Sequence, residues 1–169
     1  MAYKKMIFSL LGLMLLFSLN SCYTFTGSSL DPRIHTANIR KFPNYAPLQN
    51  PNLSQEFTNA LQLRFQQRTK LTLINTEDAD VIIDGEITDY TVTPTSVVSG
   101  DRAAQNRLTI TVKVRYENKI QEEKSFSRTF SDYGDFEANQ SLVQVQDELT
   151  EKIIKRLIDQ IFNAIVADW

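Results

Sequence analysis

The carboxyl-terminal part of the chain has the pattern of one long amphipathic helix, and its wide apolar face restricts the folds available to the rest. This face consists of Leu142, Val145, Leu149, Ile153, Ile154, Leu157, Ile158, Ile161, Phe162, Ile165 and Val166. The spacing of three and four residues is that of a helix, and Ser141 with Gln144 fits a capping box at its start. Such a face needs another apolar layer to cover it, so we expect the helix to lie on a sheet.

A second, shorter helix of about seventeen residues is predicted after a loop rich in proline and asparagine. Its apolar stripe repeats every four residues, at Leu53, Phe57, Leu61 and Phe65. The helix start is predicted in one of two ways: Asn50 caps it with Pro51 at the first helical position, or Asn52 caps it with Gln55 three residues on.

Stretches of alternating or β-branched residues predict the strands. They cover residues 36–42, 71–74, 79–94, 108–116 and 120–130. The fourth is the clearest, because Leu108 to Tyr116 alternates strictly between apolar and polar residues. The order of strands and helices predicts an α/β fold, a two-layer sandwich with two amphipathic helices packed on one face of a mixed four- to five-stranded sheet.

Turn residues predict how these strands connect. Residues 99–101 (Ser-Gly-Asp) predict the tip of a long hairpin, residues 117–119 a tight turn, and residues 133–140 a loop. Gly85 lies on the apolar face of its strand, where a missing side chain allows a helix to approach the sheet closely.

The amino terminus has the pattern of a secretory signal. Lys4 and Lys5 precede a mostly apolar run over residues 6–19, which is shorter than the about 20 residues that a membrane-spanning helix needs. Residues 19–22 (Leu-Asn-Ser-Cys) resemble a bacterial lipobox, so Cys22 is the predicted lipid-attachment residue. The predicted organisation is a signal peptide at 1–21, a lipid-anchored tether at 22–35 and one domain at 36–169. The alternatives are a buried core helix for the first segment and a free thiol for Cys22.

Composition argues against several classes of function. The 18 Lys and Arg are offset by 20 Asp and Glu, which disfavours a nucleic-acid partner. One Cys and one His make an intrachain disulfide framework, a Cys/His zinc site and a Cys–His catalytic pair improbable. The chain also lacks a Gly-rich phosphate loop and a G-x-S-x-G motif, so we expect no catalytic residues, no cofactor and no enzyme.

Two further groups of polar residues have a structural as well as a functional interpretation. His35 is expected to be a surface residue and not a base. Asp78, Asp80 and Asp84 could form a metal cluster, but an apolar run separates Asp84 from the others, so a solvated turn is preferred and no metal site is expected.

A basic cluster follows the tip and the outer face of the predicted hairpin. It contains Arg102, Arg107, Lys113 and Arg115. Such a cluster can hold phosphorylated or anionic lipid through charge-assisted hydrogen bonds. The alternative is a solvated sheet face whose cations are offset by nearby acids.

Four features of the chain occur together: the lipobox with the residues after it (22–30), the early strand and helix, residues 79–87 (Ala-Asp-Val-Ile-Ile-Asp-Gly-Glu-Ile) and the long carboxyl-terminal helix. In this combination the chain resembles the LptE-like lipopolysaccharide-assembly lipoproteins. The resemblance implies a non-enzymatic α/β plug, anchored on the periplasmic side of the outer membrane inside a large β-barrel partner that exports lipopolysaccharide. The candidate lipopolysaccharide-binding residues are the four of the basic cluster, chosen on chemistry and location. The alternative function is a periplasm-facing lipoprotein that carries a hydrophobic ligand in its own fold.

Overall fold

The computed structural model describes residues 30–48, 50–96 and 105–166. The predicted signal peptide, Cys22, the predicted hairpin tip and Arg102 lie outside these residues, so the predictions made for them stay predictions.

The observed order of elements matches the predicted one. It is β1 (Thr36–Ile39), α2 (Leu53–Arg68), β2 (Thr72–Leu73), β3 (Val81–Ser96), β4 (Gln105–Asn118), the short 3-10 helix η1 (Glu122–Lys124), β5 (Phe126–Glu137) and α3 (Leu142–Val166).

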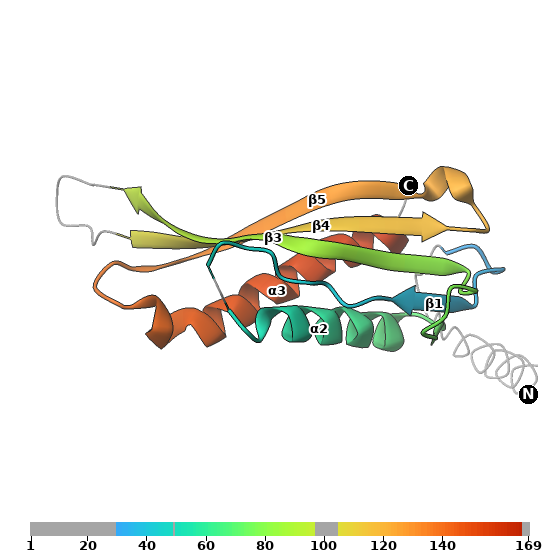
Figure 1. Cartoon of the computed structure of the whole chain (residues 1–169), viewed down its shortest axis with the longest axis horizontal. Coiled ribbons are helices and arrows are strands. Elements are labelled where there is room, and N and C mark those ends of the chain that lie inside the picture. Colours follow the sequence, from blue (N-terminus) through green and yellow to red (C-terminus); the bar gives the residue numbers. More distant parts are fainter. Residues whose placement is uncertain (1–29, 49, 97–104, 167–169) are drawn as a thin grey trace, which may run out of the picture.

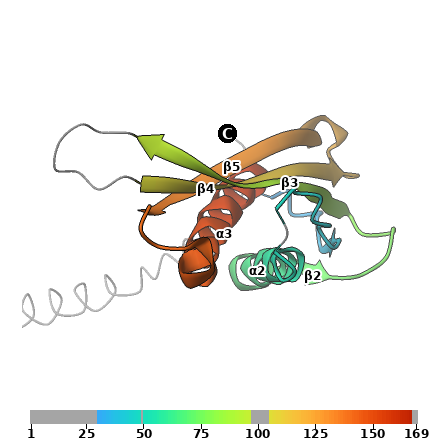
Figure 2. The same ribbon diagram turned by 60° about the vertical axis from the view of Figure 1, so that its left-hand side comes forward.

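The strands form one mixed sheet in the order β2-β1-β3-β4-β5. β1 runs parallel to β2 and to β3, whereas β3, β4 and β5 are successively antiparallel. Both helices pack on one face of this sheet, and the long strands β3, β4 and β5 form the opposite layer (Figures 1 and 2). The predicted two-layer α/β sandwich is therefore confirmed.

The core lies between the two layers and contains both predicted helix stripes. Leu53, Phe57, Leu61 and Phe65 of α2 are completely buried, as is Leu157 of α3. The helices also contact each other, since the rings of Phe65 and Phe162 meet edge to face with centroids 5.1 Å apart. Each large apolar side chain buried in this way stabilises the fold by about 1.5–3 kcal/mol.

The last two strands end later than the sequence predicts, and the last strand also begins later, at Phe126 instead of Ile120. β4 continues to Asn118, and the chain then turns through η1 instead of a tight turn at 117–119. β5 continues to Glu137, so the loop predicted at 133–140 is wrong over its first half. The helix-facing side of β5 includes Asp132, which breaks the apolar alternation; its carboxylate accepts hydrogen bonds from Arg156 and Gln160 of α3.

Gly85 allows a close approach, but not of a helix. A Cβ at this position would lie 2.7 Å from the ring of Phe42 and closer still to the carbonyl oxygen of Lys113 on β4. The expected helix contact occurs instead at Gly134 of β5, where a Cβ would lie 2.5 Å from Leu149 of α3.

Both helices start close to the predicted positions, but the predicted capping hydrogen bonds form only in part. Asn52 occupies the N-cap of α2, but its side chain makes no capping hydrogen bond. At α3, the Ser141 N–H donates to Gln144 Oε1 at 3.0 Å, which is one half of the predicted capping box. None of the helices formed by the described residues combines the length and apolar character that crossing a membrane requires.

Candidate functional site

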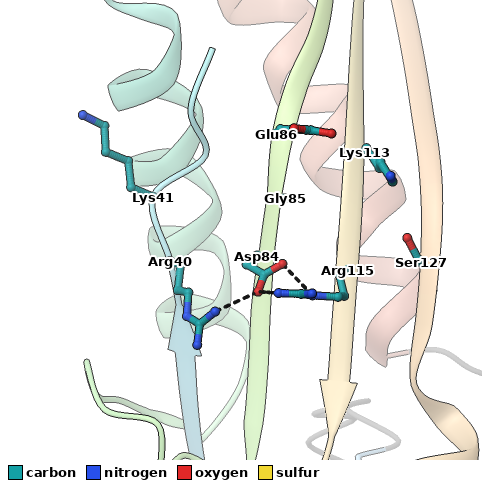
Figure 3. A pocket seen from close by; sticks show the side chains of 8 residues that line it. All are labelled: Arg40, Lys41, Asp84, Gly85, Glu86, Lys113, Arg115 and Ser127. Carbon is teal, nitrogen blue, oxygen red and sulfur yellow. Dashed lines mark hydrogen bonds and ion pairs between the residues drawn. The ribbon is translucent and has the colours of Figure 1, made fainter. Parts of the chain in front are cut away.

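The sheet face opposite the helices carries a polar hollow of about 450 Å³. Residues of β3, β4 and β5 and the two residues that follow β1 border it, and the side chain of Lys41 extends away from the others (Figure 3). The bordering residues are Arg40, Lys41, Asp84, Gly85, Glu86, Lys113, Arg115 and Ser127. The hollow is therefore bordered by four cations and two acids.

Asp84 lies at the centre of the charged groups. Arg115 donates to both of its carboxylate oxygens, from Nε at 2.9 Å and from Nη2 at 2.6 Å, while Arg40 Nη1 donates from the other side at 3.1 Å (Figure 3). The hydrogen bond to Asp84 raises the pKa of Arg115, so this guanidinium is charged at any physiological pH. Arg40 Nη2 also donates to Glu77 Oε2 at 2.5 Å, so Asp84 and Glu77 together orient the two guanidinium groups and offset their charge.

Two lysines at the hollow have no such partner. Within the described part of the chain, Lys41 and Lys113 make neither an ion pair nor a side-chain hydrogen bond, and both are exposed. Glu86 lies opposite Lys113 in the register of β3 and β4, but no ion pair joins them among the described residues. These ammonium groups are free to bind an anion from solution.

Arg107 lies on the same face of β4, six residues and about 20 Å from Lys113. Its guanidinium donates to both carboxylate oxygens of Asp135, at 2.7 and 2.9 Å, and its carbon lies 3.6 Å from the centre of the Tyr133 ring. This pairing raises the pKa of Arg107 and lowers the pKa of Asp135. Arg107 is therefore fixed in place and partly neutralised.

The structure brings together only part of the predicted basic cluster. Lys113 and Arg115 share the hollow, Arg107 lies apart from it, and Arg102 is outside the described residues. Sequence reasoning missed Arg40 and Lys41, which β1 delivers to the hollow from a distant part of the chain. The available signal was an adjacent pair of basic residues at the end of a predicted strand.

The three aspartates weighed as a metal cluster have separate structural surroundings. No group of metal-binding side chains occurs among the residues that the structure describes. Asp84 pairs with arginines, whereas Asp80 Oδ2 accepts the backbone N–H groups of His35 and Thr36 at 2.8 and 2.9 Å. The His35 N–H is the largest cause of a lowered Asp80 pKa. Asp80 is thus a structural anchor for the start of β1 and not a member of a solvated turn, and His35 is exposed as expected.

Comparisons with known proteins agree with this fold. The family described as LptE, lipopolysaccharide-assembly, matches residues 34–165. No curated protein shows a significant sequence match.

Three solved structures share the fold at low identity. A minor lipoprotein from Acinetobacter baumannii has a TM-score of 0.52 at 16% identity, over 79% of this chain and 94% of that one. Protein XCC0632 from Xanthomonas campestris has a TM-score of 0.55 at 9% identity, over 81% of this chain and 89% of that one. The hypothetical protein CT253 from Chlamydia trachomatis has a TM-score of 0.51 at 13% identity, over 79% of this chain and 99% of that one. Because the family match spans most of the described domain, the chain belongs to the LptE lipopolysaccharide-assembly family.

Proposed function

We propose that the protein is a lipid-anchored subunit of the outer-membrane machinery that exports lipopolysaccharide. In this proposal the chain is attached through Cys22 on the periplasmic side, plugs a large β-barrel partner and binds lipopolysaccharide during export. It acts by binding and not by catalysing a reaction.

The proposed binding of lipopolysaccharide rests on the hollow on the sheet face opposite the helices, which is called the cationic hollow below. Lipopolysaccharide presents phosphate groups, which guanidinium and ammonium groups bind through charge-assisted hydrogen bonds. Among the described residues, Lys41 and Lys113 form no ion pair, although Glu86 lies opposite Lys113, and Asp84 holds Arg40 and Arg115 in the same hollow. Arg107 would extend the basic surface along the hairpin, and Arg102, which lies outside the described residues, is included for its charge.

The plug part is favoured by how the two layers pack. A carrier of a hydrophobic ligand needs an apolar cavity, commonly about 300–1,000 Å³. At the interface of the layers, Leu61, Ile83 and Leu157 are instead completely buried in one core cluster. The open sheet face is polar, which suits contact with a partner or with a charged ligand.

Binding of the detergent-solubilised full chain to immobilised lipopolysaccharide tests the proposal. Replacing Lys41 and Lys113 together with Ala should weaken binding about tenfold or more, and replacing Arg102 and Arg107 together should weaken it less, because Asp135 already pairs with Arg107. Lys152→Ala with Lys155→Ala is the control: it removes two positive charges from α3, in the other layer. Equal binding by the wild type and the Lys41/Lys113 variant would overturn the assignment of this hollow.

A further inference from the structure

A second polar hollow, of about 490 Å³, lies where β2 ends beside β1. β2 pairs with Thr36 and Ala37, and within residues 30–48, 50–96 and 105–166 no strand neighbours the rest of β1 on that side. The N–H groups of Thr72 and Ile74 donate to His35 O and Ala37 O, each at 2.9 Å. The next β1 carbonyl in this series, that of Ile39, accepts instead from the side chain of Gln62 on α2, at 3.1 Å.

α2 lines one side of this hollow with a stripe of uncharged amide side chains. Gln55, Asn59, Gln62 and Gln66 recur at intervals of four, three and four residues, which places them on one side of the helix. Asn38 and Asn75 add two amides from the sheet side. The charged residues of α2 do not line the hollow.

Much of the hydrogen-bonding capacity of these amides is unused. Gln55 Nε2 donates to Asn59 Oδ1 at 2.6 Å, and Asn38 Nδ2 donates to Thr76 O at 3.0 Å. Among the described residues, the side chains of Gln66 and Asn75 make no hydrogen bond at all. Each amide offers two donors and an acceptor oxygen in one plane, without charge.

This chemistry suits a ligand with many hydroxyl groups. Neighbouring hydroxyls of a sugar ring can donate to the amide oxygen and accept from the amide nitrogen, whereas an apolar ligand would leave these groups unpaired at a cost of about 1–3 kcal/mol each. An added polypeptide strand is disfavoured, because the Ile39 carbonyl that it would pair with already accepts from Gln62.

The second hollow, called the amide hollow below, lies next to the cationic hollow. Arg40 and Lys41 line both of them. A phosphorylated sugar can therefore place its ring against the amides while its phosphate reaches the cations on the sheet face.

We propose that the hollow lined by Gln55, Asn59, Gln62, Gln66, Asn38 and Asn75 is a carbohydrate site that binds the saccharide part of a phosphorylated glycolipid. The inference rests on the proposed function and assigns the sugar and the phosphate to different side chains. Gln62 also completes the edge of β1, so it positions the site as well as lining it.

The probe is the water-soluble saccharide of deacylated lipopolysaccharide, after its phosphates have been removed, titrated into the detergent-solubilised full chain by calorimetry. Asn59→Ala with Gln66→Ala changes two exposed amides and should lower the affinity about tenfold. The matched control Gln67→Ala changes an exposed amide of α2 outside the hollow and should leave the affinity within about twofold. Lys113→Ala changes a cation that lines the hollow on the sheet face and not the amide-lined one, so this variant should bind the dephosphorylated saccharide like the wild type.

The other results would overturn the carbohydrate site, and they separate its failure from that of the proposed function. If the wild type binds intact lipopolysaccharide but not the saccharide, or if Asn59→Ala with Gln66→Ala changes nothing, the carbohydrate site is wrong and the proposed function stands. If it binds neither molecule, the binding part of the proposed function fails as well. Displacement of the saccharide by an extended uncharged peptide, at a similar concentration, would assign the hollow to a polypeptide and overturn the inference.

Discussion

Arg115 and Asp84 face each other across β4 and β3, and the guanidinium donates one hydrogen bond to each carboxylate oxygen, at 2.9 and 2.6 Å. The same carboxylate accepts from Arg40, which also pairs with Glu77, so Asp84 joins two cations at the edge of the hollow. If this face binds anions, Asp84 orients the cations and also competes with the ligand for them.

Asp84→Asn should therefore increase the affinity for lipopolysaccharide by about threefold or more, because it removes the competing negative charge. The free energy of unfolding should fall by only about 1 kcal/mol, since Arg115 is largely exposed. Asp31→Asn is the matched control, because Asp31 also pairs with an arginine, Arg33, but lies in the loop before β1. An equal effect of both variants on binding would contradict a specific role for the Asp84 site.

Gly85→Ala should be strongly destabilising, by more than about 3 kcal/mol, because the added methyl would collide with the Lys113 carbonyl and the Phe42 ring. Gly134→Ala should cost less, because its nearest obstacle is the movable end of the Leu149 side chain. Denaturant unfolding of both variants measures the difference, and equal stabilities would show that β3 can shift to relieve the contact.

Asp80→Ala should lower the free energy of unfolding at pH 7 by about 1–3 kcal/mol, since Asp80 accepts two backbone N–H groups at the start of β1. The pKa of Asp80 is lowered in the folded state, so its stabilising contribution is complete above the unfolded pKa of about 4. That contribution is lost as the pH falls through the lower folded pKa, so the difference between the wild type and the variant should shrink as the pH falls below the unfolded value. Asp78→Ala, at an exposed position two residues away, is the control and should have little effect at either pH. A difference that is independent of pH would contradict the ionic origin of the effect.

Cys22→Ala should move the protein from the membrane fraction to the soluble fraction, because the variant lacks the proposed attachment residue, and stable attachment requires two or more acyl chains. Fractionation followed by immunoblotting measures this. Unchanged retention in the membrane would refute lipid anchoring at Cys22.

The helices and the central strands were predictable because their apolar residues follow one period without interruption. The stripe from Leu53 to Phe65 and the alternation from Leu108 to Tyr116 each face one core, and the structure buries both. β5 was harder to predict, because Asp132 and Gly134 occupy its helix-facing side. Arg156 donates hydrogen bonds to Asp132, and Leu149 fills the space above Gly134. Both residues belong to α3, so the local sequence of β5 does not reveal these contacts.

The candidate site was predictable only where its residues share one strand. Lys113 and Arg115 were found because they alternate on the polar face of β4. Arg40 and Lys41 join them through the parallel pairing of β1 with β3, which a local pattern does not reveal. The amide hollow likewise depends on where β2 ends. Because β2 does not reach Ile39, the carbonyl of Ile39 accepts a hydrogen bond from Gln62 instead.

Affinity purification of the tagged full chain from its own outer membrane shows whether the protein occupies an exporting barrel. A large β-barrel protein should be recovered with it, in a constant ratio through successive purification steps. Recovery of the chain alone, under conditions that keep other barrel complexes of the same membrane intact, would contradict its role as the plug of a lipopolysaccharide-exporting barrel.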